Sequence, residues 1–136
     1  MIHIREIDHL VLRVKQLEPM LDFYCRVLGC ELERVKPELG LYQLRAGRAL
    51  IDLITVDGEL GAAGGRAAGT EGRNLDHLCL RLEPFDAEAI RVYLNAENIE
   101  VGPIEARYGA EGMGPSFYIQ DPEGNTLELK GPSQPS

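Results

Sequence analysis

Two histidines and two acids occupy matching places in the two halves of this sequence, and side chains of these types can bind a metal ion. His9 lies in the octapeptide IDHLVLRV (7–14), which returns as LDHLCLRL (75–82) with His77 in the same place. Asp52 and Glu128 each lie between two apolar residues, in the tripeptides IDL (51–53) and LEL (127–129). Imidazole and carboxylate groups are ligands for Mn, Fe, Ni, Co and Zn. The pattern predicts a divalent-metal site of His9, His77 and Glu128, with the shorter Asp52 as a fourth candidate ligand.

The two octapeptides are apolar runs that are typical of β-strands. Side chains alternate between the two faces of a strand, so residues two places apart share a face. One face therefore carries the histidine, the next-but-one residue and the arginine: His9, Val11 and Arg13 in the first copy, and His77, Cys79 and Arg81 in the second. The other face carries leucines and valine, which we expect to pack against a helix. Each histidine should thus point away from the apolar layer.

The repeat indicates that the chain is one module duplicated, because the copies are 68 residues apart in a chain of 136. In the first half, apolar spacing predicts a helix over 17–28, with Pro19 in its first turn and Gly29 at its end. Strands are predicted at 31–35, 40–44 and 49–56, with a turn at 45–48. The second half predicts a helix from Asp86 to about 98, a short strand at 99–104, a Gly-rich loop over a site at 105–115, and strands at 116–120 and 126–130 around a turn at 121–125.

The predicted fold is α+β, with two tandem βαβββ modules that form a cup-shaped mixed sheet and keep their helices outside. We expect a single domain over 1–136 whose halves, 1–56 and 75–130, are joined by a mobile Gly/Ala-rich linker at 57–74; residues 131–136 should be a frayed tail. The linker lacks the spacing of a phosphate-binding loop, which favours the linker reading. If the halves pack as pseudo-twofold copies, the four ligand candidates meet on one concave surface.

Composition excludes several classes of partner. The formal net charge is −8, whereas nucleic acids and anionic membranes attract basic surfaces. No apolar run approaches the roughly 20 residues of a membrane-spanning helix, and the first residues do not read as a signal peptide, so a cytoplasmic location is expected. The three cysteines, at 25, 30 and 79, show neither disulfide nor CxxC spacing, and Cys79 is expected to pack in the core.

The sequence resembles the vicinal oxygen chelate superfamily, which contains glyoxalase I, bleomycin- and fosfomycin-resistance proteins and extradiol dioxygenases. The resemblance covers nearly the whole chain and rests on LDHL at the start of the repeat, FY (23–24) and VLG (27–29) in the first helix, and FYIQDPEGNTLEL (117–129) near the end. It implies paired βαβββ modules, usually a homodimer, and a metal held by His9, His77 and Glu128. It also implies a small-molecule substrate whose oxygens chelate the metal.

Departures from the individual members leave the reaction open. Glyoxalase I has a glutamate that takes the substrate proton where this chain has the shorter Asp52, which puts that role as catalytic base in doubt. Fosfomycin transferases have a threonine where this chain has Val11, but this chain keeps their serine and tyrosine as Ser116 and Tyr118. Tyr118 is thus a candidate catalytic and substrate-binding residue, and Ser116 a substrate-binding one. A pair of solvated hydroxyls on a strand is the alternative.

Two functions follow from this resemblance. The first is a metal-dependent isomerase, lyase, oxirane-opening transferase or dioxygenase, with Arg13 and Arg81 contacting an anionic substrate or lying on an exposed rim. The alternative is a metal-free, bleomycin-resistance-like protein that sequesters a drug or metabolite, although the aromatic groove of such proteins is hard to build without Trp. A scaffold with a vestigial cup is a third reading. The substrate, the metal and any thiol co-substrate are not readable from the sequence.

Overall fold

A computed structural model describes residues 1–134 of the chain, which divide into two units between Gly72 and Arg73. This boundary lies inside the segment predicted to be a linker. Each unit contains one four-stranded mixed sheet, and the two units are described separately below. Within the described residues, no helix has the length and apolarity that crossing a membrane would need.

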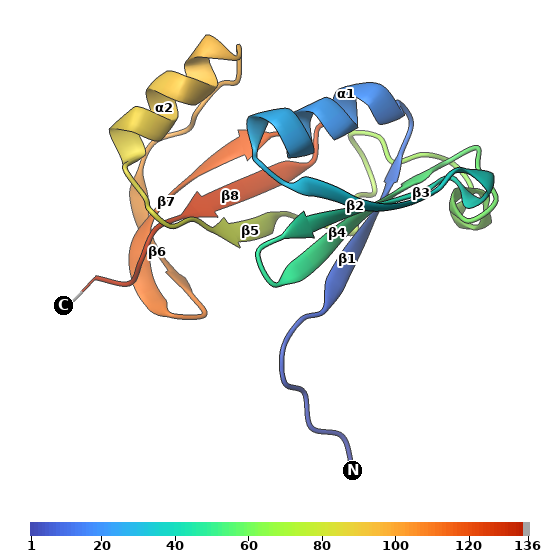
Figure 1. Cartoon of the computed structure of the whole chain (residues 1–136). Helices are drawn as coiled ribbons and strands as arrows, with labels where there is room; N and C mark the ends of the chain where they lie inside the picture. The colour runs from blue at the N-terminus through green and yellow to red at the C-terminus, as the bar shows by residue number, and fades with distance from the viewer. Residues whose placement is uncertain (135–136) are drawn as a thin grey trace. The chain divides into compact units, whose positions relative to one another are not determined.

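The first unit has the strand order β1-β4-β3-β2, with β1 parallel to β4 and the other neighbours antiparallel (Figure 1). Its elements are β1 (His9–Val14), α1 (Leu17–Leu21), the π-helical η1 (Asp22–Val27), β2 (Glu31–Lys36), the 3-10 turn η2 (Pro37–Leu39), β3 (Leu41–Ala46), β4 (Ala49–Thr55) and the 3-10 turn η3 (Gly61–Gly64). The helix predicted over 17–28 is confirmed, although its second part is π-helical. Gly29 follows it with a φ of 85°, a conformation that favours glycine.

The second unit repeats this connectivity, with the strand order β5-β8-β7-β6 and β5 parallel to β8. Its elements are β5 (Leu78–Arg81), α2 (Ala87–Ala96), β6 (Glu105–Gly109), β7 (Gly112–Gln120) and β8 (Thr126–Lys130). The Asp86 carboxylate accepts a hydrogen bond from the Ala89 backbone N–H at 3.1 Å, which caps α2 as predicted. The predicted α+β fold with two βαβββ modules is confirmed.

Two predictions for the second half are wrong. The segment 99–104 is not a strand, and the Gly-rich segment 105–115 is not a loop. Instead β6 and the first part of β7 form a hairpin whose turn is Ala110 and Glu111. Glycine weakens a strand locally, so the composition argued against pairing here. The hairpin forms because β6 pairs with β7 and β7 pairs with β8. The strand propensity of a short segment does not include the hydrogen bonds that neighbouring strands provide.

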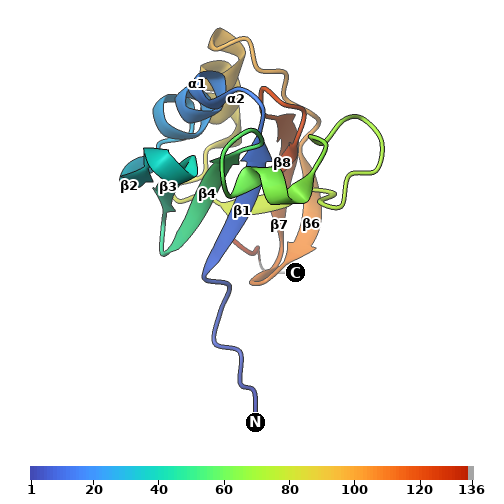
Figure 2. The same ribbon diagram turned by 90° about the vertical axis from the view of Figure 1, so that its right-hand side faces the viewer.

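Parts of the linker and of the predicted tail are also more structured than expected. The linker contains η3, and the Arg13 guanidinium donates to the carbonyl of Gly61 at 2.9 Å, which holds this turn beside β1 (Figure 2). The backbone N–H groups of Gly131 and Gln134 donate to carbonyls of β7. The chain therefore keeps pairing past the end of β8, while residues 135–136 lie outside the described part.

The two faces of each sheet differ as the alternation of the sequence predicts. Leu53 of β4 and Leu127 and Leu129 of β8 are buried on one face. In the second unit, Phe85, just before α2, packs on Phe117 of β7 with ring centroids 6.0 Å apart, so the helix side is the apolar side. Residues one place along each strand point to the opposite face, where the predicted site residues lie.

We expect Leu53→Ala to lower the free energy of unfolding by about 3 kcal/mol, because the leucine is fully buried and its removal leaves a cavity. Denaturant unfolding followed by circular dichroism would measure this. Val92→Ala on the exposed side of α2 is the control and should change stability by less than about 0.5 kcal/mol. Equal effects of the two substitutions would contradict the assignment of the core.

Candidate metal centre

His9 and Asp52 lie on the same face of the first sheet, on its two parallel strands. Val11 of β1 pairs with Asp52 of β4, so His9, two residues before Val11, is diagonal to Asp52 on one face. The His9 side chain is 47% exposed, whereas Asp52 is 4% exposed. The strand pairing thus brings an accessible imidazole near a buried carboxylate.

The neighbouring aspartate fixes the orientation of the His9 ring. His9 Nδ1 lies 2.7 Å from the Asp8 carboxylate, which can only accept, so Nδ1 carries the proton. The hydrogen bond to Asp8 raises the pKa of His9 above its ordinary value of 6.5; desolvation opposes this effect, and the charges of Asp52 and Asp8 add smaller upward contributions. In the neutral ring Nε2 is then the nitrogen with a lone pair for a metal.

Asp52 is only half satisfied by the protein. Its Oδ2 accepts a hydrogen bond from the Gln43 side-chain amide at 3.1 Å, and the Gln43 carbonyl accepts one from Arg34 at 2.9 Å. Its Oδ1 is buried and has no hydrogen-bond partner in the described structure. A buried carboxylate oxygen without a donor costs free energy unless a cation or water approaches it.

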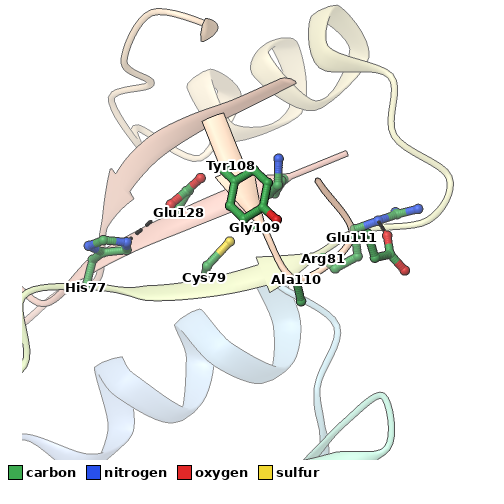
Figure 3. A pocket seen from close by; sticks show the side chains of 9 residues that line it. His77, Cys79, Arg81, Tyr108, Gly109, Ala110, Glu111 and Glu128 are labelled. Atoms are coloured by element: carbon green, nitrogen blue, oxygen red, sulfur yellow. Dashed lines mark hydrogen bonds and ion pairs between the residues drawn. The ribbon is translucent and has the colours of Figure 1, made fainter. Parts of the chain in front are cut away.

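The second unit repeats this geometry with His77 and Glu128. Cys79 of β5 pairs with Glu128 of β8, so His77 is again diagonal to the acid. His77 Nδ1 lies 2.8 Å from the Asp76 carboxylate, and His77 Nε2 lies 3.2 Å from Glu128 Oε1. Figure 3 shows the His77 and Glu128 side chains pointing toward one another.

The His77 and Glu128 atoms are spaced as two ligands of one ion would be. Two ligand atoms that each lie about 2.1 Å from a metal, at an angle near 90°, are about 3 Å apart. Glu128 is 5% exposed, and its Oε2 is a second buried oxygen without a partner. Both orphaned oxygens of the described structure therefore belong to predicted ligands, and the donor set suits a divalent transition metal.

Tyr118 and Ser116 lie on the same face of the second sheet but in different surroundings. Tyr118 pairs with Glu128 across β7 and β8 and packs edge-on against His77 at 5.4 Å between ring centroids. The Arg107 guanidinium lies 4.5 Å from the Tyr118 ring centroid and donates to the Ser116 hydroxyl at 3.0 Å. Ser116 is fully buried, so Tyr118 is the more accessible of the two to a substrate.

Both predicted arginines are engaged by their own unit. Arg13 donates to loop carbonyls of Gly61, Gly65 and Arg66. Arg81 pairs with Glu111 at 2.7 Å and with Glu83 at 3.2 Å. These contacts hold loop segments against β1 and β5. Contact of Arg13 or Arg81 with a substrate stays a prediction.

A pocket of about 310 Å³ opens beside Glu128 in the second unit, and the residues that line it are His77, Cys79, Arg81, Tyr108, Gly109, Ala110, Glu111, Glu128 and Lys130 (Figure 3). The expectation that Cys79 packs in the core is wrong, because Cys79 is exposed and lines this pocket. Desolvation, with a further contribution from Glu128, raises the pKa of its thiol to about 11. Cys79 is therefore a neutral thiol near pH 7.

Each unit thus brings one predicted histidine and one predicted acid together, and no group of three or more His, Cys, Asp or Glu side chains in residues 1–134 is arranged to hold a metal by itself. Sequence reasoning missed Gln43, Arg107 and Lys130. Lys130 could have been predicted from the alternation of side chains along a strand, since it comes two residues after Glu128 and so lies on the same face. Arg107 was not, because its segment was expected to be a loop.

We expect Asp8→Asn in metal-free protein to lower the pKa of His9 toward 6.5, because it removes the hydrogen bond that raises it. The Asp8 contact stabilises the fold below pH 6.5, and its contribution is lost as the pH rises through the folded pKa. NMR titration of the His9 ring protons would measure the shift. Asp57→Asn, on an exposed loop, removes the same charge and should leave the titration of His9 unchanged; a pKa that stays raised in Asp8→Asn would contradict the assigned cause.

Comparisons with known proteins agree with this architecture. The virulence protein STM3117 of Salmonella typhimurium is 32% identical over 126 residues, which cover 93% of this chain and 83% of that protein. Its crystal structure matches 96% of this chain and 99% of its own with a TM-score of 0.78. A structure from the mobile metagenome of V. Pseudocholerae, VPC_CASS1, matches with 26% identity and a TM-score of 0.81, covering 98% of this chain and 99% of its own.

A structure of lactoylglutathione lyase from Agrobacterium tumefaciens has the same fold, with a TM-score of 0.65, 22% identity and coverage of 93% of each chain. A family model also matches residues 6–129, nearly the whole length, and this range includes both histidines and both acids. The chain therefore belongs to the Glyoxalase/Bleomycin resistance protein/Dioxygenase superfamily.

Proposed function

We propose that this protein is a divalent-metal-dependent enzyme that acts on a small molecule by chelating two of its oxygens. His9, His77 and Glu128 would bind the metal, and Asp52 would be a fourth ligand or a general base. The proposal requires that the histidine and acid pairs of the two units bind the same ion. The reaction would be an isomerisation, a lyase reaction, an oxirane-opening transfer or a dioxygenation.

The observation that carries this proposal is the pair of orphaned carboxylate oxygens. Asp52 Oδ1 and Glu128 Oε2 are both buried without a hydrogen-bond partner in residues 1–134, and they occupy equivalent places in two separately folded units. Soluble proteins rarely leave buried charged oxygens unmatched. A divalent cation would match both, and it would do so at the positions where the duplicated pattern predicts ligands.

The histidine environments support the same proposal. Each imidazole has its Nδ1 against the aspartate that precedes it, Asp8 or Asp76. Carboxylate partners of this kind orient metal-binding imidazoles and make Nε2 a better ligand. An aspartate precedes the histidine in both halves, so both imidazoles have the carboxylate partner that a metal-binding histidine commonly has.

A bound divalent ion would supply Lewis-acid chemistry, drawing electron density from the substrate oxygens that it chelates. Asp52 can accept a proton at Oδ1, since Gln43 occupies only Oδ2. Tyr118 keeps His77 in place through its ring and presents its hydroxyl on the same sheet face. The homodimer and the cytoplasmic location stay predictions.

Metal binding is the first test. After dialysis against a chelator, we expect the protein to take up stoichiometric Mn²⁺, Ni²⁺ or Zn²⁺ in isothermal titration calorimetry, with element analysis as a check. His77→Ala and Glu128→Gln should each weaken binding by roughly 100-fold, because each removes a direct ligand. His3→Ala, outside the repeat, is the matched control and should bind as wild type does. Absence of stoichiometric metal in the wild type would sink the proposal.

Turnover is the second test. A screen of glyoxalase, fosfomycin and catechol substrates with metal-loaded protein should find one reaction that stops in Glu128→Gln. Asp52→Asn should lower kcat by about 100-fold if the aspartate is the base, and should chiefly weaken metal binding if it is a ligand. A ligand that binds equally well to wild type and His77→Ala, without turnover, would favour the metal-free sequestering protein instead.

A further inference from the structure

Lys130 is a buried lysine in the pocket beside Glu128. It is 5% exposed and lines the pocket together with Glu128, His77 and Arg81. It follows Glu128 by two places on β8, so the two side chains share a face of the sheet. Lysine is seldom buried to this extent unless its charge is matched, so its surroundings bear on what the pocket binds.

The β6–β7 hairpin holds the Lys130 side chain in one place. Its Nζ donates to the backbone carbonyls of Arg107 and Gly114, the latter at 3.1 Å. A Cβ at Gly109 would lie 2.7 Å from Lys130 Cε, and one at Gly114 would lie 3.2 Å from its Nζ. The two glycines therefore leave the room that the lysine occupies, and the ammonium is positioned before any ligand arrives.

The Lys130 charge has no anionic partner in residues 1–134. An ammonium has three N–H donors, and the two bonds that the structure gives it both end on neutral carbonyls. Arg81, the other strong cation of the pocket, is paired with Glu111 and Glu83. Lys130 therefore makes no ion pair in residues 1–134, although the Glu128 carboxylate lines the same pocket.

We propose that this pocket binds the anionic end of a small molecule, a carboxylate or a phosphate-type group, with Lys130 as the residue that recognises it. A pocket of about 310 Å³ is at the small end of the range for small-molecule sites. In placing the anion next to a metal-chelated group, the inference rests on the proposed function. The anion would accept the third N–H of Lys130 in a charge-assisted hydrogen bond.

This inference selects among substrates for the same site. An anion on Lys130 would lie on the same sheet face as Glu128 and His77, so one molecule could contact both Lys130 and the proposed metal. A neutral molecule would leave the ammonium with hydrogen bonds to neutral carbonyls alone. We therefore expect acids, such as oxo acids or phosphonates, to be preferred over their neutral amides or esters.

The test uses chelator-treated full-length protein and three probes: inorganic phosphate, acetate and neutral acetamide. We expect phosphate or acetate, and not acetamide, to shift the NMR amide signals of Gly109, Ala110 and Lys130. Lys130→Met, which keeps the length of the side chain without its charge, should weaken this binding about tenfold. Lys36→Met removes a lysine from the first unit and should bind the anion as wild type does.

The outcomes separate this inference from the proposed function. Anion binding that depends on Lys130 in a protein that takes up no metal would support the pocket and sink the metal proposal. If the protein takes up metal and Lys130→Met binds the anion as wild type does, the metal proposal is supported and the role of Lys130 is overturned. If Lys130→Met does not fold, the wild-type shifts decide: no anion-specific shift at Gly109 and Ala110 overturns the inference. The ratio of phosphate to acetate affinity identifies which class of anion the pocket prefers.

Discussion

A carboxylate oxygen that is removed from water needs a donor or a cation beside it, and this requirement applies to one buried acid on the corresponding face of each sheet. Asp52 and Glu128 are nearly fully buried, yet each keeps one oxygen without a partner in the described structure. Their other oxygens meet a side-chain amide and an imidazole. A leucine at either place would avoid this cost, and the proposed function gives both acids a task, since a cation would match each unpartnered oxygen.

Strand pairing is what places each acid next to its histidine. In both units the first strand runs parallel to the last, and the acid pairs with the residue two places after the histidine. The period of two then sets the histidine and the acid on one face. The surroundings have diverged: Gln43 flanks Asp52, while Tyr118 flanks Glu128. Both acids are buried, His9 is more exposed than His77, and His77 and Glu128 line a pocket.

The second half shows how one segment decides what a site can recognise. The hairpin of β6 and β7 provides carbonyls that accept hydrogen bonds from Lys130, and its glycines leave space for the lysine side chain. It also places Arg107 against Tyr118 and Ser116. Its sequence is rich in glycine and was expected to be a loop. The feature that made it look unstructured is the feature that lets a lysine lie against its backbone. Strand propensity reflects how a residue's own side chain packs, whereas here the side chain that packs on the hairpin is Lys130 of β8.

The sequence by itself determined the duplication, the α+β class, the helices with their cap and terminating glycine, and the faces of β1, β4, β5 and β8. These follow from local rules, namely the strand period of two, helical spacing and turn chemistry, which act over a few residues. Only the tertiary structure decided that Cys79 is exposed, that 105–120 is a hairpin, that Gln43 donates to Asp52, and that Arg107 lies against Tyr118 and Ser116. Those facts depend on which strands become neighbours, and neighbours distant in the chain leave no periodic signal in it.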